Sequence, residues 1–287
     1  MNNSNKDQSF AREKDKKERF EFGANWANFL KSLNDRKIER AMKSLQSMLG
    51  LETLEGRSFL DIGSGSGLFS LAARMLGARV HSFDYDRQSV LCTRELKRRY
   101  YPVDEEWIIE QGSVLDRQYL SRLGTFNIVY SWGVLHHTGN MRQALDDAAG
   151  LVETNGLLFL AIYNNQGWPS RFWTFIKKTY NRLPPGFRWI ILIPCFIRLR
   201  GPMILKGFLR GNPLGFWRNY SAERGMSPWH DVVDWVGGWP FEVAKPEEIF
   251  EFYFSRGFHL VKMKTCAGGK GCNEFVFRKS GHSRNSI

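Results

Sequence analysis

The sequence predicts an α/β protein built on a doubly wound, mostly parallel sheet of seven strands with a basic, aromatic helical insertion. Short apolar strand patterns alternate with amphipathic helical patterns for about a hundred residues, which is typical of parallel sheets with helical crossovers. A further helix and two further strands follow near the C-terminus. With 43% hydrophobic and 14% aromatic residues, the 287-residue chain can bury a sizeable core.

Each element is expected from its own pattern. Residues 24–50 predict a helix, because apolar residues recur at steps of three and four and Gly50 follows as a stop. Residues 58–62 predict a short buried strand. Further strands are expected within 78–84, 107–116, 126–132 and 156–163, and further helices at 67–77, 89–100 and 141–152.

The C-terminal part returns to the same alternation. Residues 245–258 predict a helix with Pro246 at its start, where the missing N–H costs nothing. Residues 259–266 and 273–279 predict two strands, antiparallel to each other across a glycine-rich turn. These strands complete the expected set of seven.

A glycine loop follows the first strand. Gly63, Gly65 and Gly67 have the spacing G-x-G-x-G, and Leu68 stands where a dinucleotide fingerprint needs its third glycine. Asp61 precedes the loop, where it would repel a pyrophosphate. S-adenosyl-L-methionine (SAM) carries an ammonium and a sulfonium but no phosphate, so this loop favours SAM over a nicotinamide dinucleotide. A tight structural turn in an unrelated α/β protein is the alternative.

A second acid strengthens the SAM interpretation. Asp84 ends the next strand, where its carboxylate can accept hydrogen bonds from both ribose hydroxyls. The loop, the acid before it and the acid at the neighbouring strand end together predict a pocket for a cationic adenosyl compound.

Four stretches carry a family resemblance: "FLDIGSGSG", "VHSFDYD", "GSVLD" and "FNIVYSWGVLHH". They resemble the successive motifs of class I SAM-dependent methyltransferases and are most similar to the ubiquinone/menaquinone-type small-molecule group. The resemblance covers residues 55–163 well and the last two strands loosely. It implies a Rossmann-like methyltransferase fold with SAM as cofactor.

The resemblance also implies which residues contact the cofactor. The third motif has Ser113 where the family usually has an acid, so either Ser113 with the Val114 backbone or Asp116 is expected to read the adenine amino group. The implied cofactor residues are Asp61, Gly63, Ser64 and Gly65 at the first motif, Asp84 at the ribose, Tyr85 near adenine, Ser113 and Val114 at the third motif, and Trp132 and Gly133 at the methionine end.

The histidines are the candidate general bases for a hydroxyl acceptor. His137 follows the fourth strand beside His136, at the rim where parallel sheets build their sites. His230 is the more suggestive candidate, with Asp231 beside it as an orienting carboxylate, and a structural cluster or part of a metal site are the alternatives. The four cysteines contain no CxxC pair, and we predict no metal.

The stretch 164–222 has a distinctive composition. It contains ten Lys/Arg, twelve aromatics and no Asp or Glu, in a chain of net charge +12. A lid, a surface for anionic membrane and a platform for nucleic acid all fit it. Lys177, Lys178 and Arg182 represent its basic side chains. We favour a lid that also touches a membrane or lipid-like acceptor, and no nucleic-acid module is recognised.

These observations predict four segments and one activity. Residues 1–50 form a helical lead-in and cofactor cap, 51–163 the SAM-binding core, 164–240 a substrate-covering insertion, and 241–287 the last helix and strands. We expect O-methylation of a small or lipid-linked acceptor, such as a quinone-type phenol or a sugar. Methylation of RNA or protein and non-catalytic SAM binding are the alternatives. A cytoplasmic location is expected, since no secretory signal is recognised, and peripheral contact with an anionic membrane stays open.

Overall fold

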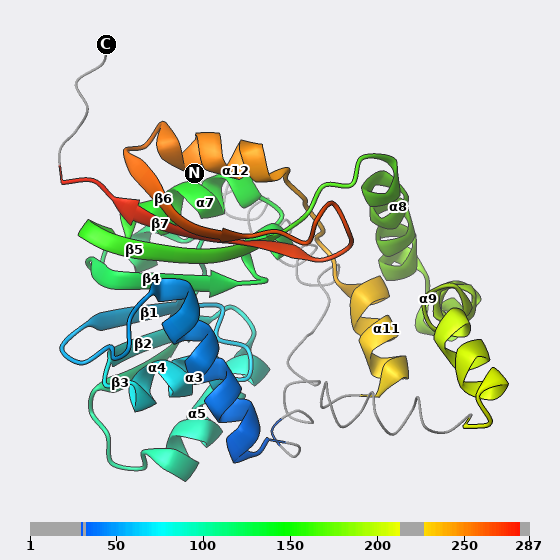
Figure 1. Cartoon of the computed structure of the whole chain (residues 1–287), viewed down its shortest axis with the longest axis horizontal. Coiled ribbons are helices and arrows are strands. Elements are labelled where there is room, and N and C mark those ends of the chain that lie inside the picture. The colour runs from blue at the N-terminus through cyan, green and yellow to red at the C-terminus, as the bar shows by residue number, and fades with distance from the viewer. Residues whose placement is uncertain (1–29, 31–32, 213–226, 282–287) are drawn as a thin grey trace, which may run out of the picture. The chain divides into compact units, whose positions relative to one another are not determined.

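The computed structural model describes residues 30, 33–212 and 227–281, except for the side chain of His230. They belong to two compact units. One is the helical stretch Trp168–Phe241, and the other holds the sheet, from the described residues up to Gly167 and from Glu242 onward (Figure 1).

The sheet has the seven strands that the sequence predicts, in the order β3-β2-β1-β4-β5-β7-β6. Five strands are parallel to one another, and β7 runs antiparallel to both β5 and β6. The expected antiparallel arrangement of the last two strands is therefore confirmed. The strands are β1 Ser58–Ile62, β2 Arg79–Asp84, β3 Trp107–Gln111, β4 Phe126–Trp132, β5 Val152–Tyr163, β6 Phe258–Lys264 and β7 Cys272–Lys279.

Helices cover both faces of this sheet (Figure 1). The face packed by α3, α4 and α5 and the face packed by α6, α7 and α12 each have a hydrophobic core of their own. These helices are α3 Asp35–Leu49, α4 Leu68–Met75, α5 Arg87–Tyr100, α6 Arg117–Leu120, α7 Met141–Gly150 and α12 Pro246–Phe254, and a 3-10 helix η1 spans Leu135–His137.

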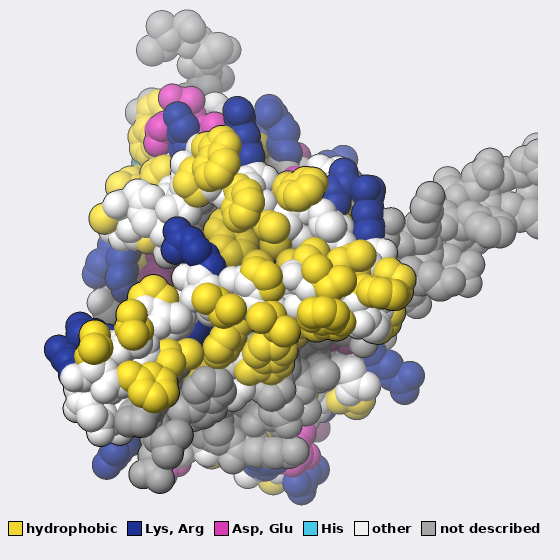
Figure 2. Space-filling view, turned by 90° about the vertical axis from the view of Figure 1, so that its right-hand side faces the viewer, with side chains coloured by type: hydrophobic (Ala, Val, Ile, Leu, Met, Phe, Trp, Pro, Cys, Tyr) yellow, Lys and Arg dark blue, Asp and Glu magenta, His cyan; other side chains and the backbone are white. Residues whose placement is uncertain are grey.

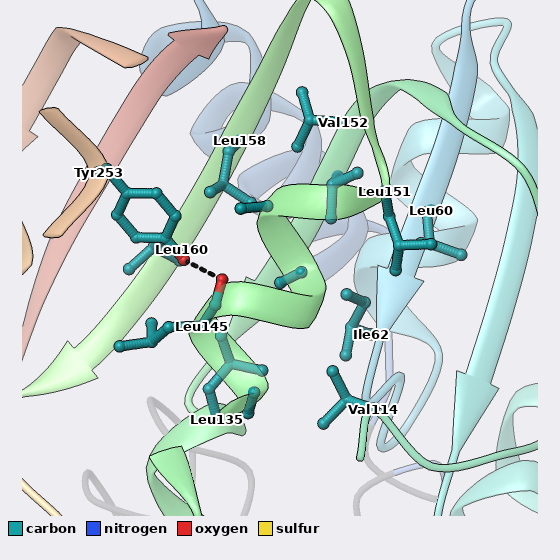
Figure 3. Packing of buried hydrophobic residues seen from close by; sticks show 14 of the residues in the cluster. Leu60, Ile62, Val114, Leu135, Leu145, Leu151, Val152, Leu158, Leu160 and Tyr253 are labelled. Carbon is teal, nitrogen blue, oxygen red and sulfur yellow. Dashed lines mark hydrogen bonds between the residues drawn. The ribbon is translucent and has the colours of Figure 1, made fainter. Parts of the chain in front are cut away.

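The core between the sheet and α7 explains why the strands appear in the sequence as apolar runs. Leu60 and Ile62 of β1 and Leu158 of β5 point to this face (Figure 3). Their neighbours Phe59, Leu157 and Phe159 belong to the core on the other face. Tyr253 of α12 enters the same core, and its hydroxyl donates a hydrogen bond to the carbonyl of Leu145 at 3.1 Å. This bond satisfies the one polar atom of a fully buried ring.

The helix expected at 24–50 lies partly outside the described residues. Its described C-terminal part is α3, which begins at Asp35, because the side chain of Asn34 accepts a hydrogen bond from the Lys37 amide and so caps it. At its other end Gly50 has the left-handed conformation that the stop signal predicts, with φ of 68°. In the lead-in that is expected to cap the cofactor, Phe22, Asn25 and Trp26 could contact it, and all three lie outside the described residues.

The described part of the insertion is helical. Its elements are α8 Trp168–Arg182, the 3-10 helix η2 Pro185–Phe187, α9 Trp189–Leu209 and α11 Pro228–Gly237. A small core of Tyr180, Leu192, Val232 and Val236 joins α8, α9 and α11. Among the residues described, no helix has the length and apolar character needed to cross a membrane.

Candidate cofactor and active site

The cofactor residues that the sequence predicts gather at one edge of the sheet. Strand order reverses between β1 and β4, because β1 continues to β2 on one side and β4 to β5 on the other. In open α/β sheets ligands bind outside the carboxyl ends of the strands at such a switch point. The glycine loop follows β1 at this edge, Asp84 ends β2 and Trp132 ends β4.

The glycine loop is tied to the end of β2. The amides of Gly63 and Ser64 both donate to the carbonyl of Phe83, at 2.8 and 3.2 Å. Gly67 caps α4 with φ of 79°, and a Cβ there would lie 2.9 Å from the backbone Cα of Thr93. The hydroxyls of Ser64 and Thr93 are 2.9 Å apart, which fixes the loop on α5. The loop is therefore rigid and closely packed, as a preformed cradle requires.

Asp84 binds the loop as well as facing the site. One carboxylate oxygen accepts from the amide of Gly65 at 2.9 Å, and the other accepts from the amide of Asp86 at 2.8 Å. Burial raises the pKa of Asp84 to about 6, although both amides favour the ionised form. Each oxygen can accept a second hydrogen bond, so a ribose diol fits the carboxylate.

Asp61 is a buried acid supported by a chain of hydrogen bonds. The indole Nε1 of Trp107 donates to the hydroxyl of Ser82 at 2.9 Å, Ser82 donates to Ser70 at 2.8 Å, and Ser70 donates to Asp61 at 2.5 Å. Asp61 is 2% exposed. Burial raises the pKa of Asp61 to about 7 against the opposing effect of the Ser70 hydroxyl, and the neighbouring Asp84 raises it further.

The raised pKa of Asp61 is consistent with a carboxyl that has no cationic partner in the described structure. In the described structure no Lys or Arg forms an ion pair with this carboxyl. Burial disfavours the ionised form of a carboxyl, and a positively charged ligand group beside Asp61 would restore its charge. The ammonium of SAM has the required sign, and the residues of this site fit that cofactor.

The two alternatives for the adenine amino group differ in their contacts. Asp116 caps α6, and its side chain accepts from the amide of Tyr119 at 3.0 Å. Ser113 accepts from the amide of Leu115 at 3.2 Å, and Val114 is buried in the core beneath the loop. The capping role of Asp116 favours Ser113 with the Val114 backbone.

Two aromatic side chains at this edge are exposed. Tyr85 follows β2 and Trp132 ends β4, and each is 44% exposed. Large apolar rings left partly in water at a strand edge are suited to contact a ligand. Gly133, next to Trp132, has φ of 77°, so the chain turns away from the strand at once.

The two adjacent histidines have different roles in the packing. His136 is fully buried, and its Nδ1 accepts from the amide of Tyr163 at 3.4 Å, while its carbonyl accepts from the amide of Glu242 at 2.9 Å. These bonds make His136 a structural connection between η1, β5 and the start of the C-terminal segment. His137 is partly exposed and meets the Tyr163 ring edge-on, with 5.4 Å between ring centroids.

The second candidate base lies in the other unit. His230 and Asp231 belong to α11, and Asp231 forms an ion pair with Arg200 of α9. The ion pair gives the Asp231 carboxylate a packing role between these two helices. In the next turn of α11, burial raises the pKa of Asp234 to about 7, with a further rise from Asp231 and an opposing effect of Lys177. No metal-binding group of three or more His, Cys, Asp or Glu occurs in the described ranges.

Sequence reasoning did not identify the chain of hydrogen bonds that ends at Asp61. Ser70 and Ser82 read as ordinary small residues in a helix and a strand, and Trp107 reads as a core aromatic. A signal was present, since Ser70 is a polar residue on the otherwise apolar buried face of α4. Its partner could not be identified without the strand register.

Known proteins resemble this chain in sequence and in fold. A family model described as a methyltransferase domain matches residues 26–187. The ubiquinone biosynthesis O-methyltransferase of Rhodopseudomonas palustris (strain HaA2) is 28% identical over 145 residues, which is 50% of this chain and 51% of that protein. The enzyme of the same name from Rhizobium johnstonii is 30% identical over 113 residues, 39% of this chain and 43% of its own.

The chain thus spans about half the length of the curated relatives it matches. A solved structure, PKMT2 from Rickettsia typhi in complex with AdoHcy, is similar with a TM-score of 0.55 at 13% identity, over 86% of this chain and 54% of that one. At that identity the likeness concerns the fold alone.

Proposed function

Because this chain belongs to the methyltransferase domain family, whose methyl donor is SAM, we propose that it methylates a hydroxyl oxygen of a small or lipid-linked acceptor. A quinone-type phenol or a sugar is the proposed acceptor. The observation that best supports SAM as the methyl donor is the buried carboxyl of Asp61, whose pKa is raised to about 7 chiefly by burial. The names of the curated relatives favour an oxygen acceptor.

The contacts of these residues support the proposed cofactor-binding roles. Asp61 faces the ammonium of the methionine part and Asp84 accepts from the ribose hydroxyls, while Ser113 and the Val114 amide read adenine. SAM supplies a methyl group bonded to a positively charged sulfur. Trp132, partly exposed at the end of β4, shields that end of the site from water.

Removal of the acceptor proton is assigned to His137. A neutral imidazole would take the proton of the acceptor hydroxyl, and the oxygen would then be a better nucleophile toward the methyl group that bound SAM would supply. The edge-on contact with Tyr163 holds the His137 ring in one orientation. His230, with Asp231 beside it in α11, is the second candidate base.

Methyl transfer from labelled SAM to a panel of phenols, catechols and sugars tests this proposal, with mass spectrometry locating the new methyl group. We expect His137→Gln to lower kcat with little change in the SAM dissociation constant. His230→Gln tests the second base, and His259→Gln, an exposed residue of β6, is the matched control. Methylation of carbon or nitrogen only, or unchanged kcat in both histidine variants, contradicts the proposal.

A further inference from the structure

The outward side of helices α8 and α9 is an apolar surface, here named the α8–α9 face. Its aromatic members on α8 recur at helical spacing, and the rings of Trp168 and Phe172 stack with centroids 5.6 Å apart. All members are more than two-fifths exposed. The face consists of Trp168, Phe172 and Phe175 on α8 and Trp189, Ile190, Ile193 and Ile197 on α9.

Helix α9 is apolar on both of its sides. Only Leu192 and Cys195 of its 21 residues are buried, in the core that includes Val232 and Val236 of α11. Its outer side is also apolar, and there the side chain of Ile197 is 61% exposed and that of Trp189 is 57% exposed. Because α9 already buries one apolar side, the exposed apolar stripe on its outer side is suited to a second contact.

Basic side chains accompany this surface and acidic ones do not. From position 164 to 222 the sequence has no Asp or Glu. Hydrophobic side chains gather over the helical unit with Lys and Arg among and beside them (Figure 2). The exposed cations are Arg171, Lys178 and Arg182 on α8, Arg198 and Lys206 on α9, and Arg210 just after it, and none forms an ion pair within the described part of the chain.

We propose that the α8–α9 face docks on the surface of a lipid bilayer that contains anionic phospholipid. Exposed isoleucines such as Ile193 and Ile197 suit acyl chains, since they have no ring with which to stack on nucleic-acid bases. The flanking cations suit phosphate headgroups. A helix with an exposed apolar stripe and basic neighbours lies in the plane of the membrane interface rather than across it. This proposal holds whatever acceptor the enzyme methylates.

One basic residue expected at this surface is not part of it. Lys177 is 1% exposed, donates to the carbonyl of Trp235, and lies over the rings of Trp235 and Phe241 at 4.3 and 4.6 Å from their centroids. The sequence interpretation that grouped Lys177 with Lys178 and Arg182 as surface cations is wrong for Lys177. Its position on the side of α8 that faces α11 puts the amine inside the helical unit.

The electrostatic part of the proposal is tested by flotation of the full chain with phosphatidylcholine vesicles, with and without phosphatidylglycerol. We expect binding only to the anionic vesicles, weakened by added salt. The variant Arg171→Gln/Lys178→Gln/Arg182→Gln should bind about a hundredfold more weakly, because each basic residue near an anionic surface contributes about fivefold. The matched control, Arg36→Gln/Arg40→Gln/Lys43→Gln, removes equal charge from exposed positions of α3 and should bind as wild type does.

The apolar part is tested by tryptophan fluorescence with vesicles of brominated lipid, which quench only rings that enter the acyl region. Wild type should be quenched, and Trp168→Phe/Trp189→Phe should lose most of that quenching while keeping the wild-type melting temperature. Four results would overturn the proposal. They are equal loss of binding in the α3 control, binding without quenching, equal binding to uncharged vesicles, and displacement by RNA. Burial of the face in a dimer that light scattering detects and vesicles do not dissociate would also overturn it.

Discussion

Replacing Asp61 with Asn should have opposite effects on stability and on cofactor binding. The carboxyl pKa is 3.8 in an unperturbed chain and about 7 in the fold, mainly because of burial. At about 1.4 kcal/mol for each pH unit, this difference corresponds to about 4 kcal/mol of stability. Because the pKa is raised on folding, that stability is present below pH 4 and is lost as the pH rises to 7.

Asn cannot ionise, and its side-chain oxygen can still accept from Ser70. Without cofactor at pH 8, Asp61→Asn should therefore be more stable than wild type by up to about 4 kcal/mol, and the difference should vanish near pH 4. SAM binding changes in the opposite direction, because loss of the ammonium partner should weaken it by about 1.5–3 kcal/mol. In wild type, SAM affinity should rise with pH through about 7 as Asp61 ionises.

Urea unfolding at pH 4, 6 and 8 and calorimetric titration with SAM measure both effects. The control is Asp104→Asn, since the hydrogen bond from Arg74 lowers the pKa of Asp104 and its contribution has the opposite sign. That variant should be less stable at pH 8 and should bind SAM normally. The reasoning fails if cofactor-free Asp61→Asn is the less stable protein at pH 8, or if it binds SAM as tightly as wild type.

Three further outcomes are expected. Asp84→Ala should weaken SAM binding by about 1.5–3 kcal/mol by losing charge-assisted bonds to the ribose, and unchanged affinity in a calorimetric titration would exclude the ribose role. Gly67→Ala should destabilise the fold by about 1–3 kcal/mol, because of its φ of 79° and the approach of the new Cβ to Thr93, and urea unfolding measures this. Tyr253→Phe should cost about 1 kcal/mol by leaving the buried carbonyl of Leu145 without its donor, and an unchanged melting curve would contradict that assignment.

The alternating part of the fold was predictable from the sequence because buried parallel strands leave a strong pattern. The expected strand at 58–62 coincides with β1. β5 begins at Val152, earlier than the 156 expected, since Val152 pairs with Phe126 before a register shift restores the main ladder. A polar stretch that continues a strand through such an irregularity has no periodicity that sequence reasoning can detect.

The tertiary partners of charged residues were not predictable. Lys177 has the sequence context of a solvated helix face, and only the packing of α11 against α8 shows that its amine is enclosed by aromatic rings. Likewise, Asp231 beside His230 suggests a base and its orienting acid, but Arg200, 31 residues earlier, forms an ion pair with it. Spacing along the chain identifies neighbours within one helix or strand, whereas these contacts join residues of different helices.

The hydrogen bonds behind Asp61 run in one direction. The indole N–H of Trp107 donates to Ser82, Ser82 donates to Ser70, and Ser70 donates to Asp61. A tryptophan two strands away from β1 thus helps to set the acidity at the ligand's charged end. Cofactor affinity in this enzyme can therefore be tuned from its interior, at a position that a search limited to the pocket walls would omit.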